Sequence, residues 1–259
     1  MNISGKSIIV TGAAAGIGRA AAIQFAKKGA ARVIVVDIDD EGMTETARLV
    51  TAAGAITRTE HIDLADISSL ESWLVREAAT DGGYDILYNN AGIVSGTPQF
   101  PEAGARKIKL IVDVNLTSLM TTTEIALAAM KSRGGGVIVN TVSTVALGNG
   151  FTDVLYSATK AGAHMFVKAC SPMQETHNVR VLGVLPGLTD TPILLKTGAN
   201  GEAASWMQPV LENYERCTPD DIADAVMDLV ERDDIPGGSW VAVRRTDGKV
   251  EREWSECAI

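Results

Sequence analysis

Residues 8–19 read Ile-Ile-Val-Thr-Gly-Ala-Ala-Ala-Gly-Ile-Gly-Arg, an apolar run followed by a turn with three glycines. The run predicts a buried strand, and a helical pattern begins after the turn. Gly12 permits a tight turn, Gly16 lets the backbone approach a phosphate, and Gly18 allows the helix to pack closely on the strand. Free N–H groups at the start of such a helix bind a pyrophosphate. The other reading is a tight strand–helix turn with no ligand.

Asp37 follows the next apolar run, Val33–Val36, and lies 19 residues after Gly18. A carboxylate at this place accepts hydrogen bonds from the ribose diol of a dinucleotide and repels a 2′-phosphate. No lysine or arginine stands where a cation could compensate, at Ala13, Ala14, Ala15 or Ile38. The pattern therefore favours NAD over NADP. The alternative is a solvated acid at a strand end, since Asp39, Asp40 and Glu41 lie beside it.

Short apolar runs alternate with helical stretches along the chain. We expect strands in the runs Ser7–Val10, Val33–Val36, Ile86–Tyr88, Val137–Val139, Val179–Val184 and Trp240–Val243, and in the weaker run Ala55–Ile62. One helix should follow Asp153, with a buried stripe that comprises Leu155, Ala158, Thr159, Gly162, Ala163, Phe166, Val167 and Cys170. Another should begin at Pro219, capped by Thr218. The alternation predicts one α/β domain over residues 1–259, a doubly wound (Rossmann-type) parallel sheet of about seven strands with helices on both faces.

Composition excludes several classes of protein. The 259 residues carry 23 Lys and Arg against 32 Asp and Glu, a net charge of −9, whereas nucleic acids and anionic membranes attract basic surfaces. Three cysteines without CxxC spacing and three scattered histidines predict neither a disulfide framework nor a metal site. The sequence shows no long uncharged apolar stretch and no signal-peptide pattern, so we expect a cytoplasmic protein that does not span a membrane.

Tyr156 and Lys160 stand four residues apart in the helix expected after Asp153, so their side chains share a face. A phenol has a pKa near 10 and is a poor base at neutral pH. A nearby ammonium favours the phenolate, and lowering the pKa of Tyr156 to about 7 requires about 4 kcal/mol, which we expect from the ammonium together with the positive nicotinamide of the cofactor. Tyr156 would then take a proton from a substrate alcohol as hydride leaves its carbon. Ser143 would hold the same oxygen and stabilise its developing charge.

Motifs in a fixed order make the chain similar to the short-chain dehydrogenase/reductase family over nearly its whole length. Thr11–Gly18 matches TGxxxGxG, and Asp63-Leu64 resembles the acidic pair that holds the adenine. Asn89–Gly92 matches NNAG, and Tyr156–Lys160 matches YxxxK. Further matches are Asn115 in a helix, Ser143 after the fifth expected strand, and Pro186-Gly187 with Thr189 and Thr191. The resemblance implies a hydride-transferring oxidoreductase with a small-molecule substrate, and a homodimer or homotetramer.

The resemblance also assigns roles residue by residue. It implies a catalytic set of Asn115, Ser143, Tyr156 and Lys160, in which Asn115 holds a water that connects Lys160 to solvent. Lys160 would also reach the nicotinamide ribose hydroxyls. It implies that NAD is held by Gly12, Ala14, Gly16, Ile17, Gly18, Asp37, Ile38, Asp63, Leu64, Asn90, Ala91, Gly92, Tyr156, Lys160, Pro186, Gly187, Thr189 and Thr191.

Two features depart from the commonest family pattern. Leu182 stands where many relatives carry Asn, and the chain runs on through Thr246-Asp247-Gly248 to Glu256–Ile259 where many relatives end. This ending looks more like the branch that contains 15-hydroxyprostaglandin dehydrogenase and insect-type alcohol dehydrogenases.

Substrate choice should come from loops beyond the strand ends. The largest is 192–214, which we expect to close as an apolar lid, although Trp206 and Met207 could simply pack beneath a surface helix. Candidate substrate contacts are Val94, Leu147, Asp153, Leu194 and Trp206, with Asp153 alternatively a helix cap. No cation is clearly aimed there, so the expected substrate is a medium-sized, mostly apolar secondary alcohol or ketone. A non-catalytic NAD-binding regulatory or scaffold protein is the alternative.

Overall fold

A computed structural model describes residues 1–80, 82–148, 151–198 and 201–255. Eight strands form one sheet in the order β3-β2-β1-β4-β5-β6-β7-β8. The strands are β1 (Ser7–Thr11), β2 (Arg32–Asp37), β3 (Ile56–His61), β4 (Ile86–Asn89), β5 (Gly136–Thr141), β6 (Val179–Pro186), β7 (Trp240–Thr246) and β8 (Lys249–Trp254). The first seven are parallel, and the strand order reverses between β1 and β4. The expected doubly wound α/β fold is confirmed.

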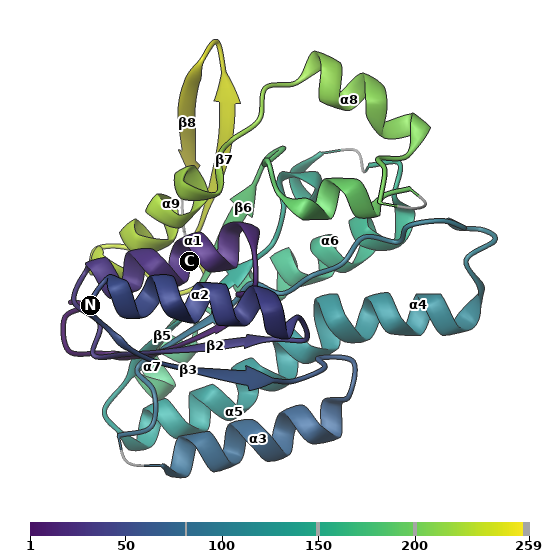
Figure 1. Cartoon of the computed structure of the whole chain (residues 1–259). Coiled ribbons are helices and arrows are strands. Elements are labelled where there is room, and N and C mark those ends of the chain that lie inside the picture. The colour runs from purple at the N-terminus through teal and green to yellow at the C-terminus, as the bar shows by residue number, and fades with distance from the viewer. Residues whose placement is uncertain (81, 149–150, 199–200, 256–259) are drawn as a thin grey trace.

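Helices cover both faces of the sheet, as Figure 1 shows for α1 and α2 on one face and α3 and α5 on the other. The helices are α1 (Gly16–Lys27), α2 (Asp40–Ala52), α3 (Ile67–Ala79), α4 (Gly104–Val112), α5 (Ser118–Ser132), α6 (Val154–Ala169), α7 (Met173–His177), α8 (Gln208–Asn213) and α9 (Pro219–Glu231). Alternate residues of β1 face opposite ways: Ile8 packs towards α1 and α9, and Ile9 towards α3 and α5.

An eighth strand, β8, was not among the expected strands. It pairs antiparallel with β7 and half-buries Val250, Arg252 and Trp254 while its alternate residues are exposed. Asp247 and Gly248 make the turn, both with positive φ (50° and 73°), which is the backbone that two-residue hairpin loops require. The Asp-Gly pair between two strand-forming runs was thus the signal in the sequence that could have predicted this hairpin. Residues 256–259, the rest of the expected ending, lie outside the described residues.

The predicted helix starts are confirmed at α6 and α9. Thr218 and Asp221 form a capping box at α9, with Pro219 in the first helical position. Asp153 caps α6, whose buried stripe includes Leu155 and most of the expected residues, whereas Ala158 is exposed. Ala158 was expected in the buried stripe but is exposed, because it lies at the edge of that stripe.

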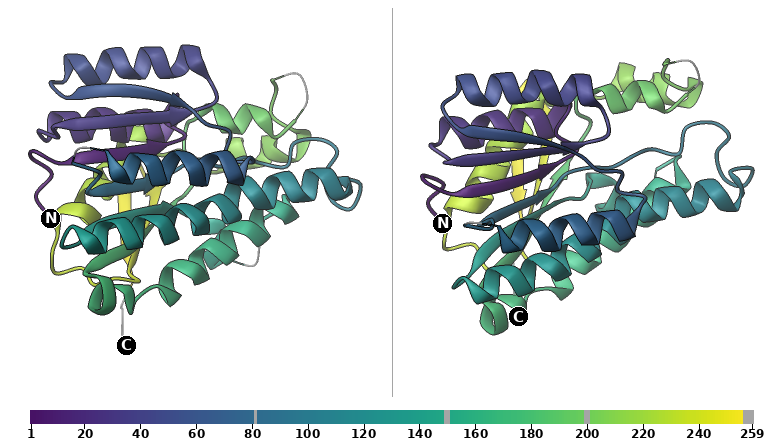
Figure 2. Two further views of the ribbon diagram at one scale, coloured as in Figure 1. Left: turned by 90° about the horizontal axis from the view of Figure 1, so that it is seen from below. Right: turned by 60° about the horizontal axis from the view of Figure 1, so that its bottom comes forward.

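One helical stretch, Gly104–Ser132, is long and apolar enough to cross a membrane by length and composition alone. It comprises α4, a π-helical turn (Asp113–Thr117) and α5. Its residues Ala126 and Met130 are fully buried in the core, and 39% of its most apolar 18-residue window is buried. Figure 2 shows the same stretch running along one side of the molecule.

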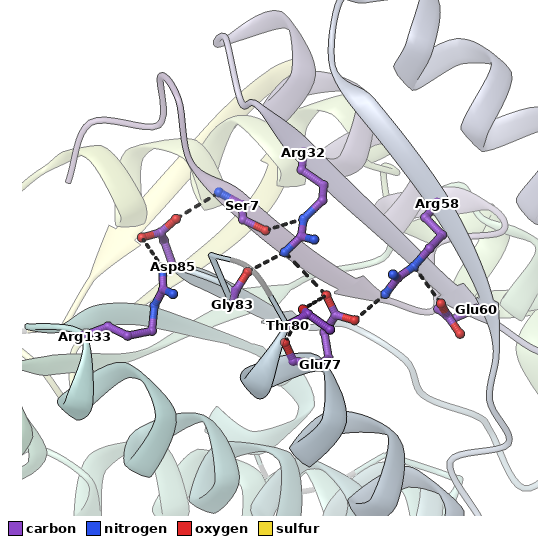
Figure 3. Close-up of polar contacts among 9 residues, drawn as sticks. All are labelled: Ser7, Arg32, Arg58, Glu60, Glu77, Thr80, Gly83, Asp85 and Arg133. Carbon is purple, nitrogen blue, oxygen red and sulfur yellow. Dashed lines mark hydrogen bonds and ion pairs between the residues drawn. The ribbon is translucent and has the colours of Figure 1, made fainter.

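A network of charges joins the amino ends of several strands, opposite the ends that carry the predicted site (Figure 3). Glu77 of α3 is 3% exposed and pairs with Arg32 of β2 at 3.4 Å and with Arg58 of β3. Arg32 also donates to Ser7 Oγ (2.9 Å), and Ser7 N donates to Asp85 (2.9 Å). Two guanidiniums around one buried carboxylate fix α3 against β2 and β3.

Arg180 of β6 is buried and holds the carboxyl end of α9. Its guanidinium donates to the carbonyls of Leu229 (3.2 Å), Val230 (2.8 Å), Arg232 (2.8 Å) and Ile235 (3.1 Å). We expect Arg180→Met to lower the free energy of unfolding by about 3 kcal/mol, because buried carbonyls lose their donors. Urea denaturation measures the change. The exposed Arg48→Met is the control, expected to cost less than about 1 kcal/mol, and an equal loss in both variants would contradict this role for Arg180.

Candidate active site

The glycine-rich turn after β1 is packed too closely for side chains. Gly12 and Gly16 have positive φ (64° and 53°). A Cβ on Gly12 would lie 2.7 Å from Ala91 Cα, and one on Gly18 would lie 2.2 Å from the Gly12 carbonyl oxygen. Ala15 gives the start of α1 no capping side chain, so the first N–H groups of this helix are available to a ligand. A turn without side chains at a helix N-terminus leaves room and N–H donors for a dinucleotide pyrophosphate.

The loop after β4 is bonded to this turn. Thr11 Oγ1 accepts from the backbone N–H groups of Asn90 (3.0 Å) and Ala91 (3.2 Å). The Asn90 amide donates to the carbonyls of Thr11 (3.2 Å) and Gly12 (3.1 Å). Asn90 therefore fixes the position of the turn, and Ala91 and Gly92 follow it along the carboxyl edge of the sheet.

Asp37 ends β2 directly beside the turn. Its carboxylate accepts from the backbone N–H groups of Ala14 (3.0 Å), Ile38 (2.8 Å) and Asp39 (3.2 Å). A carboxylate has about four lone-pair sites, so these three bonds leave acceptor capacity for a further donor. The nearby guanidinium of Arg19 is bonded to Thr46 Oγ1 (2.9 Å) and to the carbonyls of Ala14 and Gly42. These contacts fix the guanidinium of Arg19, which is half-buried, between the turn and α2.

The remaining predicted cofactor residues lie at the same edge. Asp63 and Leu64 follow β3, where Asp63 accepts from Ala65 N (2.9 Å) and Leu64 is buried. Pro186 ends β6, and Gly187 N donates to the Val243 carbonyl (2.7 Å). Thr189 Oγ1 donates to the Gly187 carbonyl (2.9 Å). Thr191 reaches the glycine turn, since its Cγ2 lies 3.0 Å from where a Gly16 Cβ would stand. Ile17 is half-buried in the first turn of α1.

Tyr156, Lys160 and Ser143 come together at the carboxyl end of β5. Lys160 is 2% exposed, and its Nζ donates to the Thr141 carbonyl (2.8 Å) and lies 5.6 Å from the centroid of the Tyr156 ring. Ser143 is 7% exposed, its Oγ accepts from Val145 N (3.3 Å), and its side chain lies close enough to Tyr156 to lower the pKa of the phenol. Thr141, which positions Lys160, was missed because its carbonyl, and not its side chain, makes the contact.

Burial governs the protonation of this pair in the chain alone. It raises the pKa of Tyr156 to about 12, against the lowering effect of the Ser143 hydrogen bond and with a further rise from the charge of Asp153. Burial lowers the pKa of Lys160 to about 8. The lowering of the Tyr156 pKa expected from Lys160 together with the cofactor's nicotinamide stays a prediction, because these values describe the chain without its cofactor. Additional positive charge is needed for the phenolate to form.

Asn115 lies in the π-helical turn between α4 and α5, not in a regular α-helix. Its side-chain oxygen accepts a hydrogen bond from Ile93 N (2.8 Å). Its side-chain nitrogen donates to the Ile93 carbonyl (2.8 Å) and to Thr159 Oγ1 (3.1 Å). It is 1% exposed. Asn115 thus ties the loop after β4 to α6, one residue from Lys160. Its role in holding a water stays a prediction.

The structure gives Asp153 the capping role. Its carboxylate is 1% exposed and accepts from Tyr156 N (3.1 Å), Ser95 N (2.7 Å) and Ser95 Oγ. These protein donors occupy the carboxylate, which therefore acts on the site by anchoring the start of α6 and the loop after β4. Ser95 was not singled out from the sequence, because a lone serine in a loop carries no pattern.

Residues 192–214 form two short 3₁₀ turns (Pro192–Lys196 and Ser205–Met207) and α8, with residues 199 and 200 outside the description. Leu194, Val94 and Leu147 are half-buried. Met207 is 2% exposed and packs inside, whereas Trp206 lies edge-on to Phe151 with ring centroids 5.2 Å apart. Met207 therefore has the packing role that was the alternative expectation, and the role of Trp206 in a lid stays a prediction. Closure of the segment as a lid stays a prediction.

The chain is similar to known proteins in sequence and in structure. A family model described as short chain dehydrogenase matches residues 6–201. A cis-4-hydroxycyclohexanecarboxylate dehydrogenase from Sinomonas cyclohexanicum is 31% identical over 218 residues, which cover 84% of this chain and 86% of that protein.

Two solved structures show which cofactors similar proteins bind. A 7α-hydroxysteroid dehydrogenase complexed with NADH and 7-oxo glycochenodeoxycholic acid superposes with a TM-score of 0.77 at 27% identity, covering 88% of this chain and 89% of that one. A protein from Beutenbergia cavernae with bound NADP has a TM-score of 0.77 at 26% identity, covering 89% and 92%. Similar folds thus hold either dinucleotide.

Proposed function

The chain belongs to the short chain dehydrogenase family, and on that basis we propose that it is an NAD-dependent dehydrogenase or reductase that interconverts a medium-sized, mostly apolar secondary alcohol and its ketone. The observation that carries the proposal is the convergence of Ser143, Tyr156 and the buried Lys160 at the carboxyl end of β5, where Lys160 Nζ lies 5.6 Å from the centroid of the Tyr156 ring. Lone residues of these types have ordinary structural roles. Here they converge at the same edge of the sheet as the glycine-rich turn. This arrangement favours a catalytic role over the alternative of a non-catalytic NAD-binding protein.

The residues of the chain would bind the cofactor, hold the substrate oxygen and transfer the proton. The first turn of α1 with Gly12, Gly16 and Gly18 would hold the pyrophosphate, and Asp37 the adenosine ribose. The bound dinucleotide supplies the hydride acceptor or donor and, when oxidised, a positive charge. Tyr156 would take or give the proton on the substrate oxygen, and Ser143 would hold that oxygen by a hydrogen bond. Lys160 would keep positive charge beside the phenol.

The preference for NAD rests on Asp37. We expect Asp37→Asn to reduce the ratio of kcat/KM for NAD over NADP by about 10- to 100-fold, because juxtaposed like charges cost a few kcal/mol. The single oxygen of asparagine can still accept from Ala14 N, whereas its NH2 group cannot accept from Ile38 N and Asp39 N as the second carboxylate oxygen does. Initial rates with each cofactor measure the ratio. Asp40→Asn, which changes a largely exposed acid paired with His61, is the control. An unchanged ratio in Asp37→Asn would make Asp37 only a strand-end acid.

The substrate class draws support from the names of two similar proteins. One carries hydroxycyclohexanecarboxylate in its name and the other is a hydroxysteroid dehydrogenase. Both names describe hydroxyl groups on saturated rings, so alicyclic secondary alcohols are the first class to test. The experiment is a screen of such alcohols for NADH formation, with open-chain alcohols of equal carbon number for comparison.

We further propose a homodimer or homotetramer located in the cytoplasm. The apolar side chains of Ile108 (36% exposed), Leu110 (44%) and Met120 (36%) lie along the Gly104–Ser132 stretch, and burial between subunits would remove them from water. Light scattering of the purified protein gives the mass of the assembly, and a monomer at micromolar concentration would contradict the proposal.

A further inference from the structure

Two polar side chains join the glycine-rich turn to α1 and α2, which lie side by side on one face of the sheet (Figure 1). Arg19 of α1 donates from Nε to Thr46 Oγ1 of α2 (2.9 Å). Its Nη2 donates to the carbonyls of Ala14 and Gly42, the second at 3.3 Å. The Thr46 hydroxyl lies within hydrogen-bond distance of the carbonyls of Ala13 (2.9 Å) and Gly42 (3.0 Å). The turn and both helices therefore meet in one hydrogen-bonded junction.

This junction is closely packed. Thr46 is fully buried and Arg19 is half-buried. A Cβ on Gly42 would lie 2.8 Å from both the Cβ and the carbonyl oxygen of Ala14, so the first turn of α2 contacts the glycine-rich turn directly. Buried polar groups are nearly always hydrogen-bonded, and here both side chains bond to carbonyls of the glycine-rich turn and of α2. The two side chains therefore fix the turn where it contacts α2.

One peptide group of the turn connects this junction to Asp37. The carbonyl of Ala13 and the N–H of Ala14 belong to the same planar peptide group, in which they point in opposite directions. Thr46 holds the carbonyl, and the N–H donates to Asp37 Oδ2 (3.0 Å). Arg19 holds the next carbonyl along the chain, that of Ala14, and also the Thr46 hydroxyl. The direction of the Ala14 N–H is thus set by two side chains that were not among the predicted cofactor residues.

We propose that Arg19 and Thr46 are positioning residues that set the preference for NAD over NADP by fixing the orientation of the Asp37 carboxylate. The inference rests on the proposed function, in which Asp37 binds the adenosine ribose. Oδ1 of this carboxylate accepts from the N–H groups of the next two residues, and Oδ2 accepts from Ala14 N, so the bond to Ala14 restrains its rotation. Hydrogen bonds to a ribose diol require this fixed direction, and repulsion of a 2′-phosphate falls as a carboxylate turns away from it.

The test titrates NADH and NADPH into the protein without substrate and follows their fluorescence. Thr46→Val removes the hydroxyl at nearly equal volume, and Arg19→Met removes the guanidinium. Each variant should lower the ratio of the NADPH Kd to the NADH Kd by about fivefold, the effect of losing a typical hydrogen bond. Thr46→Ser keeps the hydroxyl and should keep the ratio within about twofold. Thr44→Val is the matched control, because Thr44 is exposed on the same helix and bonds to the Asp40 carbonyl (2.8 Å).

A double-mutant cycle separates this role from a general loosening of the turn. In the Asp37→Asn background Thr46→Val should change the ratio by less than about twofold, because the carboxylate that it positions is gone. An equal fall in both backgrounds, or an unchanged ratio in both Thr46→Val and Arg19→Met, would overturn the inference even if alcohols are oxidised. A fall that requires Asp37, in a protein that turns over no alcohol, would support the inference and overturn the proposed function.

Discussion

Tyr156→Phe should lower kcat/KM for the alcohol by about 10³-fold or more while NADH binding changes by less than about twofold. The variant removes one oxygen, the atom that exchanges the proton with the substrate, and general acid–base catalysis by one group contributes about 10²–10⁴-fold. The phenylalanine ring keeps the packing of a half-buried side chain. Ser143 remains to hold the substrate oxygen, so binding should persist. Steady-state rates and NADH fluorescence titration measure the two effects separately.

The matched control for this variant is Tyr84→Phe. Tyr84 is also buried, and its hydroxyl has no partner among the described residues, so losing it should leave turnover within about twofold. If Tyr156→Phe retained most of the wild-type rate, the proton would have to move through another group. Equal losses in the two variants would indicate damage to the fold and not to the chemistry.

Lys160→Met should abolish turnover yet make the protein more stable at pH 7. Folding lowers the pKa of Lys160 from its ordinary value of 10.5 to about 8. Below pH 8 the amine is charged in both states, and its burial costs up to about 3 kcal/mol. Methionine fills a similar volume without the charge. Loss of the bond to the Thr141 carbonyl offsets about 1 kcal/mol of this gain.

The stability difference between Lys160→Met and wild type should depend on pH. Between pH 8 and 10.5 the unfolded wild-type chain binds more protons than the folded one, so wild-type stability rises with pH. The advantage of the variant should therefore be largest below pH 8 and shrink towards pH 10. Unfolding midpoints in urea across this range measure it. An advantage that stayed constant with pH would show that Lys160 is not buried as a charged group.

The sequence predicted the features that local patterns encode. The glycine turn, the strand ends at Asp37 and Ser143, and the capped starts of α6 and α9 each depend on residues a few positions apart. Family membership, expected from ordered motifs, is confirmed by the match over residues 6–201. The hairpin that adds β8 carried its own local signal in Asp247-Gly248, but its alternating charged residues read as a tail and not as a buried strand.

Features that depend on contacts between distant segments could not be predicted. Asn115 sits in a π-helical turn, where its amide is bonded to Ile93 and Thr159 from distant segments. The Asp153 carboxylate is occupied because Ser95 reaches it from 58 residues away. The pKa of Tyr156 depends on burial, which spacing to Lys160 does not reveal. Gln99 and Trp206 line the same hollow because the loop after β4 packs against residues 192–214.

The most direct test follows NADH fluorescence when alicyclic secondary alcohols are mixed with NAD, or separately with NADP, and either wild-type protein or Tyr156→Phe. We expect NADH formation by the wild-type protein, a rate about tenfold or more lower with NADP because of Asp37, and no signal above background from Tyr156→Phe. Reduction of NAD at equal rates by both proteins, or no reduction of either cofactor despite measurable NADH binding, would contradict this expectation.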